Sequence, residues 1–327
     1  MKKILITGGA GYVGSHTAKM LKQKGYEPIV FDNLDYGHRY AIQWGGFIKG
    51  DLNNFHDINY AIAKVKPAGV VHCAAYTYVG ESVENPAKYY QNNVVGSLNL
   101  AKAMIENNLN NLVFSSTCAT FGNVEKLPIL ETTPQKPISP YGTSKLMVEM
   151  MLADFDKAYG LKHINLRYFN VCGADIEAEI GEDHNPETHL IPLVIEAAMG
   201  TRENIKIFGN NYDTPDGTCL RDYIHVNDLA NAHILALEYL FKNNKSNDFN
   251  LGSEKGYSVL EVINAVEKVS GKNISKIFED RRAGDPAILV ADSDKAKTEL
   301  GWVAEYKDIV KIVETAYKWH SKPKSIE

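Results

Sequence analysis

The sequence predicts an α/β fold in which a doubly wound parallel sheet is followed by a smaller C-terminal α/β lobe. Three observations lead to this class: short β-branched runs alternate with segments of helical periodicity, the runs are continuously apolar, and the pattern changes after about residue 170. Alternating strands and helices are typical of βαβ units. Uninterrupted apolar strands are typical of a sheet that helices cover on both faces.

The first half of the chain is expected to contain five strands and two clear helices. The strands are residues 4–7, 28–32, 69–74, 112–116 and 163–169. Apolar residues recur with helical spacing over residues 13–21 and 94–105. Gly25 stops the first helix, and the asparagine-rich residues 107–111 stop the second.

The second half is predicted to form a smaller, irregular lobe. We expect a polar loop over residues 175–189, a helix over 191–199, a strand over 205–208, turns over 209–217 and a helix over 228–241. The predicted domains are therefore residues 1–170, to which residues 222–250 return, and residues 171–327.

Composition limits the classes of function. The 327 residues are 44% hydrophobic and 23% charged, and the formal net charge of −5 argues against a nucleic acid or an anionic membrane as partner. No apolar run approaches the roughly 18 residues that span a membrane, and glycine interrupts the first run too early for a signal peptide. The four cysteines lack metal-type spacing, which favours reduced thiols and a cytoplasmic location.

Glycines between the first strand and the first helix predict a phosphate-binding turn. They fit the G-x-G-x-x-G spacing in the strand–helix context that this motif requires. The first glycines, Gly8 and Gly9, allow a tight turn. Gly11 allows a pyrophosphate to approach the backbone, and Gly14 allows the helix to pack closely on the strand. The free N–H groups of the helix N-terminus then face the phosphates. The residues predicted at the pyrophosphate are Gly8, Gly11, Tyr12, Val13 and Gly14.

An acidic residue at the end of the second strand predicts which dinucleotide binds. Asp32 lies eighteen residues after Gly14. A carboxylate there accepts both hydroxyls of the adenosine ribose and repels a 2′-phosphate, so NAD is predicted over NADP, with Asn33 beside it. The alternative is that Asp32 and Asn33 only start a turn. Because strand, glycines, helix, strand and acid occur in this order, we predict an NAD-binding domain of the Rossmann type.

A tyrosine and a lysine four residues apart predict a proton-transfer site. Tyr141 and Lys145 lie in a segment with helical spacing, so they share one helix face. A free tyrosine has a pKa of about 10, and a nearby cation favours the phenolate. The pair is therefore expected to lower the pKa of Tyr141 towards neutrality, although a Tyr-x-x-x-Lys pattern alone also occurs on ordinary helix surfaces.

A hydroxyl cluster supports the functional interpretation of this pair. Ser115, Ser116 and Thr117 end a predicted strand, and ligands of open parallel sheets bind at the carboxyl ends of strands. This places a hydroxyl beside the tyrosine. The alternative is an ordinary turn sequence.

Further motifs carry a resemblance to a known family. They are Thr7–Gly14, Tyr141–Lys145, Arg167–Asn170 and Arg221–His225, together with residues 79–82, 89–94, 207–209, 216–218 and 281–285. With these motifs the chain resembles the extended short-chain dehydrogenase/reductases over residues 1 to about 302, and within them the branch that epimerises UDP-sugars at carbon 4. The resemblance implies NAD and interconversion of UDP-glucose and UDP-galactose through transient oxidation at the sugar 4-position.

The resemblance also implies roles for individual residues. Tyr141 would take the proton of the sugar 4-hydroxyl, Lys145 would hold the nicotinamide ribose, and Thr117 would bridge the sugar and the tyrosine. Further NAD contacts would come from Asp51, Leu52, Ala74, Ala75, Asn92 and Tyr168. The UDP-sugar would be held by Asn170, His189, Leu190, Phe208, Arg221, Arg282 and Asp285.

The two arginines have an alternative interpretation. Guanidinium groups suit a diphosphate through bidentate contacts. However, Arg221 and Arg282 could equally form surface ion pairs with Asp222 or Asp285.

One residue is expected to set the range of sugars. In the family, a position shortly after the Arg-Arg-x-Gly-Asp motif lines the pocket beside the sugar 2-position, and a tyrosine there excludes an N-acetyl group. The matching residue is Leu289, which is shorter, so UDP-N-acetylglucosamine and UDP-N-acetylgalactosamine are predicted as additional substrates. The alternative is that Leu289 is ordinary strand core.

No metal is predicted. His184 and His189 are five residues apart in an acidic loop and resemble a ligand pair, but the implied reaction needs no metal. The family further implies a homodimer that pairs through the helices of residues 94–105 and 141–152.

Two rival functions remain at this stage. The first is a nucleotide-sugar dehydratase of the same fold, which needs an acid and a base directly after the threonine, where Cys118 and Ala119 stand. The second is a non-catalytic NAD-sensing module. Such modules tend to lose the Tyr–Lys pair that this chain keeps.

Overall fold

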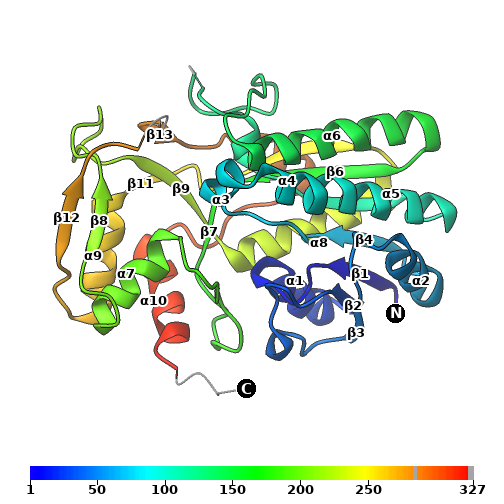
Figure 1. Ribbon diagram of the computed structural model, residues 1–327, viewed down its shortest axis with the longest axis horizontal. Helices are drawn as coiled ribbons and strands as arrows, with labels where there is room; N and C mark the ends of the chain where they lie inside the picture. The colour runs from blue at the N-terminus through cyan, green and yellow to red at the C-terminus, as the bar shows by residue number, and fades with distance from the viewer. Residues whose placement is uncertain (125, 283–285, 323–327) are drawn as a thin grey trace.

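A seven-stranded sheet forms the centre of the larger part of the molecule (Figure 1). The computed structural model describes residues 1–124, 126–282 and 286–322. The strand order is β10-β6-β5-β4-β1-β2-β3, and all neighbours are parallel. The strands are β1 (Lys3–Thr7), β2 (Glu27–Asp32), β3 (Gly46–Lys49), β4 (Gly69–His72), β5 (Asn111–Ser115), β6 (Lys162–Tyr168) and β10 (Asn247–Leu251). The predicted α/β class is confirmed.

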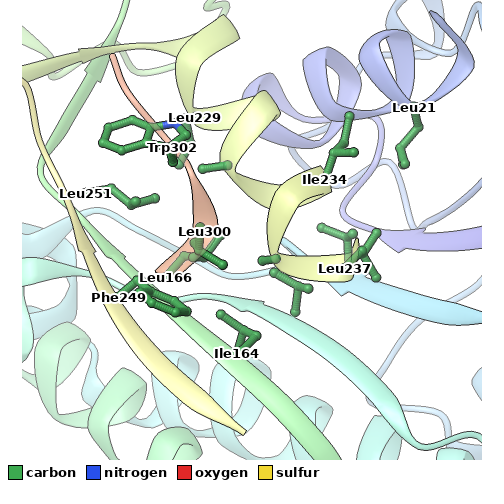
Figure 2. Packing of buried hydrophobic residues seen from close by; sticks show 14 of the residues in the cluster. Leu21, Ile164, Leu166, Leu229, Ile234, Leu237, Phe249, Leu251, Leu300 and Trp302 are labelled. Carbon is green, nitrogen blue, oxygen red and sulfur yellow. The ribbon is translucent and has the colours of Figure 1, made fainter. Parts of the chain in front are cut away.

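Helices cover both faces of this sheet. They are α1 (Tyr12–Gln23), α2 (Phe55–Val65), α3 (Val79–Glu84), α4 (Pro86–Tyr89), α5 (Gly96–Glu106), α6 (Pro140–Tyr159) and α8 (Val226–Asn243). One core lies under α1 and α8 and includes Trp302 from far along the chain, as Figure 2 shows. A second core lies under α2, α5 and α6. Because apolar side chains fill both faces, only the strand ends remain open for ligands.

The remaining elements form a smaller lobe with a core of its own. Strand β9 (Leu220–His225) pairs with β7 (Asn170–Cys172), β11 (Gly256–Ser258) and β13 (Ile288–Leu289). Strand β8 (Ile205–Phe208) pairs with β12 (Lys276–Glu279). Helices α7 (Leu190–Met199), α9 (Val259–Ser270) and α10 (Ile309–His320) pack together beside these strands. Short helical turns occur at Arg39–Ala41, Tyr90–Val95, Cys118–Thr120 and Ala296–Leu300.

Most predicted elements lie within one or two residues of the observed ones, and the differences have local causes. The helix expected over residues 94–105 begins as a π-helical turn at residues 90–95 and becomes α5 only at Gly96. The loop over residues 175–189 contains no named helix or strand. Among the described residues, no helix has the length and apolarity needed to cross a membrane.

Candidate active site

A cleft of about 810 Å³ runs along the carboxyl ends of the central strands and adjoins a second cleft of about 410 Å³ beside β8 and β9. The two share part of their walls, including Asn170 and His189. Predicted cofactor residues that line the larger cleft are Gly8, Gly11, Tyr12, Val13, Gly14, Asp32, Asn33, Asp51, Leu52, Ala74, Ala75, Asn92 and Tyr168. Residues far apart in the sequence therefore meet along one surface.

The turn between β1 and α1 requires glycine at two positions. Gly8 has a φ of +70°, and a Cβ there would lie 2.6 Å from the backbone nitrogen of Ala74. A Cβ on Gly14 would lie 2.2 Å from the carbonyl oxygen of Gly8. Gly11 caps α1 without a side chain, so the N–H groups at this helix end face the cleft and suit a phosphate.

Asp32 has two functions in this structure. Its carboxylate accepts the backbone N–H of Ala10 at 3.0 Å and that of Leu34 at 2.8 Å, so it does organise a turn. Burial raises its pKa, and these two bonds lower it. The same carboxylate lines the larger cleft, where two oxygens with four acceptor sites leave capacity for ribose hydroxyls. The two interpretations of the sequence are thus compatible.

Thr117 and Tyr141 line the larger cleft beside the end of β5, and Lys145 is held against the same strand end. Ser139 caps α6 by accepting the N–H of Gly142 at 3.2 Å, which fixes Tyr141 in the first turn. The side chain of Thr117 hydrogen-bonds to the phenol of Tyr141. Lys145 is 3% exposed, and its Nζ donates to the carbonyl oxygen of Ser115 at 2.8 Å.

The expected lowering of the Tyr141 pKa by Lys145 is wrong for the chain alone. Burial raises the pKa of Tyr141 to about 12, and the bond to Thr117 opposes this rise only in part. Burial also lowers the pKa of Lys145 to about 8. The physical reason is desolvation, which disfavours the charged form of both groups. Tyr141 consequently needs further positive charge nearby before it can act as a base.

Polar and aromatic side chains line the second cleft. Among the predicted substrate residues, it is lined by Asn170, His189, Leu190, Phe208, Arg221 and Arg282. The Arg282 guanidinium lies 4.0 Å from the ring centroid of Phe208, so it covers one face of this predicted substrate residue. Asn170 donates to the carbonyl oxygen of Asp222 at 3.1 Å. The predicted residue Asp285 lies outside the described residues.

The suggested pairing of Arg221 with Asp222 is disfavoured by the strand geometry. These neighbours lie on β9, where successive side chains point to opposite faces. The buried Asp222 carboxylate accepts the N–H of Ser253 at 2.7 Å and that of Ala291 at 3.1 Å, and burial raises its pKa to about 6. Arg221 instead lines the second cleft, where it suits an anion.

Leu289 lies next to the clefts but lines neither of them. It belongs to β13, opposite Arg221 in the register, and packs against a small core that includes Phe169 and Ile129. Phe169 lines the larger cleft. Leu289 therefore packs behind a residue that lines the cleft, and it is itself a half-buried residue of a strand.

The family model that matches residues 4–252 is described as the NAD dependent epimerase/dehydratase family. The chain belongs to this family.

Several members of the epimerase/dehydratase family align with nearly the whole length of this chain. The UDP-glucose 4-epimerase of Lacticaseibacillus casei is 49% identical over 97% of this chain and 96% of its own length. The structure of UDP-glucose 4-epimerase from Brucella ovis in complex with NAD is 47% identical, covers 97% of this chain and 98% of that chain, and has a TM-score of 0.96. The UDP-Glc/GlcNAc 4-epimerase of Campylobacter jejuni is 43% identical, covers 98% and 99%, and has a TM-score of 0.87.

The sequence analysis missed one cluster of this epimerase/dehydratase and noted only the histidines of another. Glu149 is buried against Arg167 and accepts a hydrogen bond from Ser116, directly before Thr117. Its position, four residues after Lys145 on the same helix face, was the available signal. The second cluster joins Glu182 and Glu187 to the two loop histidines. Its signal was the alternation of acids and histidines over residues 182–189.

Proposed function

We propose that this protein interconverts UDP-glucose and UDP-galactose by NAD-dependent oxidation and reduction at the sugar 4-position. One observation carries the proposal: Tyr141 and Thr117 line the same cleft as the glycine turn and Asp32, which form a cradle for a dinucleotide, and Lys145 is held at the strand end that precedes Thr117. The names of the relatives support the same reaction.

The residues of the cradle fit NAD. The turn at Gly8 and Gly14 has no room for a Cβ, so the backbone itself forms the surface that a pyrophosphate contacts. The buried carboxylate of Asp32 suits two ribose hydroxyls and repels a 2′-phosphate. When bound, NAD supplies a hydride acceptor that is regenerated in each cycle, and its positive charge beside the phenol.

The chain's own groups handle the proton and the orientation of the sugar. Tyr141 takes the proton of the 4-hydroxyl through its phenol oxygen and later returns it, while Thr117 holds that oxygen in place. Lys145, with a pKa of about 8, is largely cationic at neutral pH and would hold the nicotinamide ribose beside the phenol. Because Tyr141 is buried, water is kept from the proton that moves.

The second cleft holds the UDP part in this proposal. Arg221 and Arg282 would bind the diphosphate, and Phe208 would lie beside the base, after Arg282 moves from its ring. Residues 1–170, with residues 222–250, would form the NAD-binding domain, and the rest of the chain would hold mainly the UDP-sugar. A firmly held nucleotide would let the sugar turn over between the two half-reactions.

The test is turnover of both sugars by the purified protein and by Tyr141→Phe. We expect the wild type to reach the same mixture of UDP-glucose and UDP-galactose from either side. The variant is expected to retain NAD and lose at least about 100-fold in rate, since it lacks the transferable proton. No interconversion by wild type would overturn the proposal, and NADP released on denaturation would overturn the role of Asp32.

The same experiment separates the rival functions. A dehydratase needs an acid and a base after Thr117, but Ala119 has no titratable group and burial raises the pKa of Cys118 to about 12. The residues that follow Thr117 therefore disfavour elimination of water. An NAD-sensing module would bind its ligands in both forms and turn over in neither.

We further propose N-acetylated UDP-hexoses as additional substrates. Leu289 supports this idea because it backs the cleft wall without the length of a tyrosine, and the Campylobacter jejuni relative is named for both Glc and GlcNAc. Overfilling a packed site typically costs about 1–3 kcal/mol, so Leu289→Tyr is expected to reduce turnover of the acetylated pair about 5- to 100-fold and to spare the other pair. Equal effects on both pairs, or no acetylated turnover by wild type, would reject the idea.

We also propose a cytoplasmic homodimer. The side chains of Val95, Leu98, Met147 and Met150 on or beside α5 and α6 are 36–61% exposed, although they are apolar, which favours a covered face. Among the described residues the four cysteines form no disulfide, as is expected of thiols in the cytoplasm. Light scattering should give a dimer for wild type and for the control Tyr60→Glu on α2, and a monomer for Leu98→Glu. A monomeric wild type would contradict this arrangement.

A further inference from the structure

The loop before α7 brings together four side chains of metal-binding type. The ligand atoms of Glu182, His184, Glu187 and His189 all lie within 4.8 Å of one another. The cluster sits where the two clefts meet, because Glu182 and His189 line both of them. The proton-transfer steps derived above use neither of the two carboxylates nor His184.

We propose that Glu182, His184, Glu187 and His189 form a binding site for one divalent transition-metal ion of the zinc class. This inference stands independently of the proposed function.

The four ligand atoms lie close enough together to share one ion. Nδ1 of His184 lies 3.2 Å from Glu182 Oε1 and 3.7 Å from Glu187 Oε2. Nδ1 of His189 lies 2.8 Å from Glu182 Oε1 and 2.9 Å from Glu187 Oε1. An ion with bonds of about 2.0–2.1 Å to four ligands holds neighbouring ligand atoms about 3.3 Å apart. Small side-chain shifts would therefore complete the coordination.

The direction of one histidine gives a second, independent observation. Nδ1 of His184 is buried and has no hydrogen-bond partner, although the carboxylate oxygens of Glu182 and Glu187 lie near it. Buried polar atoms rarely lack a partner, and an ion between the side chains would supply one.

Charge and ligand type select the class of ion. Glu187 Oε1 already accepts the backbone N–H groups of Thr188 at 2.7 Å and His189 at 2.8 Å, which leaves Oε2 for an ion. The two buried carboxylates balance the charge of a divalent ion. Two imidazole nitrogens favour zinc-type ions over magnesium or calcium, which prefer oxygen ligands. Four protein ligands make a closed, structural site.

Protons compete with the ion for the same nitrogens. Burial alone would lower the pKa of both histidines, but Glu182 and Glu187 raise the pKa of His184 to about 9 and that of His189 to about 10. In the alternative to a metal site, two protonated histidines and two carboxylates form an ionic cluster. Metal binding should therefore be measured at pH 8, where fewer protons compete than at neutral pH.

The experiment uses the purified full chain, treated with a chelator and freed of it. Titration with Co²⁺ at pH 8 should show one saturable site per chain at micromolar concentration, with the visible absorption of four-coordinate cobalt, and Zn²⁺ should remove that absorption. Zn²⁺ should also raise the melting temperature of the wild type.

Variants distinguish this site from ionic contacts elsewhere. His184→Ala and the more conservative Glu187→Gln should each weaken Co²⁺ binding at least tenfold and lose the thermal shift, and His56→Ala on the exposed side of α2 should keep both. Absence of one-to-one Co²⁺ binding by wild type overturns the proposal. So does a His184→Ala or a Glu187→Gln protein that folds and binds Co²⁺ as wild type does.

Discussion

Replacing Glu149 with glutamine should lower both stability and turnover, because this carboxylate joins the helix that bears Tyr141 to the sheet. Glu149 and Arg167 are each 4% exposed. The Glu149 carboxylate accepts Arg167 Nη2 at 2.7 Å and Nε at 3.1 Å, Gln135 Nε2 at 2.9 Å, and the hydroxyl of Ser116. Glutamine removes the charge and one of the two acceptor atoms, so several of these bonds cannot form.

The size of the loss follows from what remains around the guanidinium. Removing one partner of a buried ion pair costs about 3–5 kcal/mol, since the other charge stays buried. Asp248 Oδ2 still lies 3.2 Å from Arg167 Nη2, although its side chain is 39% exposed. We therefore expect Glu149→Gln to lower the free energy of unfolding by about 3 kcal/mol, at the low end of that range.

Glu149→Gln should also shift the pH dependence of turnover. Glu149 raises the pKa of Lys145, which burial lowers to about 8. Without the carboxylate, Lys145 loses its proton at a lower pH, so the alkaline limb of the pH–rate profile should move to lower pH. A shift of Ser116 would also displace Thr117 from its place beside the phenol of Tyr141.

Denaturant unfolding followed by circular dichroism measures the first effect, and turnover against pH measures the second. The matched control is Asp248→Asn, which removes the more exposed partner of the same arginine and should cost less than about 1 kcal/mol. Equal destabilisation by the two substitutions, or an unchanged alkaline limb in Glu149→Gln, would refute the reasoning.

Three further predictions concern the cofactor cradle and the core. Asp32→Asn should reduce the preference for NAD over NADP at least about tenfold, as measured by competitive binding, because a repulsion of more than 1.4 kcal/mol is removed; an unchanged ratio contradicts this. Gly14→Ala would place a Cβ 2.2 Å from the carbonyl oxygen of Gly8 and should lower NAD content and melting temperature; unchanged NAD content would contradict this. Burial lowers the pKa of His72 to about 3, so below pH 6.5 the unfolded state binds a proton that the folded state does not. The free energy of unfolding should therefore fall as the pH is lowered from 6.5 towards 3, less steeply in His72→Asn; equal slopes would exclude a role for His72.

The central part of the fold was predictable because its strands are apolar and its turns contain glycine. Five strands of the seven-stranded sheet were expected near their observed positions. Strand β10 was missed because its sequence, Asn-Asp-Phe-Asn-Leu, carries polar residues that bind neighbouring segments: Asn250 donates to the carbonyl oxygen of Ile129 at 2.9 Å. Such pairing is set by tertiary contacts and leaves no periodicity in the local sequence.

The site was predictable as a set of residues and less so as an electrostatic environment. The spacing of Tyr141 and Lys145 placed them on one helix face, but it could not show how deeply both are buried. Burial decides the direction of both pKa shifts here, and it depends on side chains from several elements. The cluster around His184 was likewise hidden, because its geometry depends on the path of an irregular loop.

The late arrival of β10 at the edge of the sheet has a consequence for protein synthesis. As the ribosome releases the chain from its N-terminus, β6 emerges with one edge unpaired, and about 80 residues follow before β10 can cover it. Helix α8 and Trp302, which complete one face of the sheet, also emerge late (Figure 2). Until then the nascent chain exposes a bare strand edge and an uncovered apolar face, both of which favour association with other chains. A chaperone that binds extended apolar segments should therefore have its longest period of access while the smaller lobe is being made.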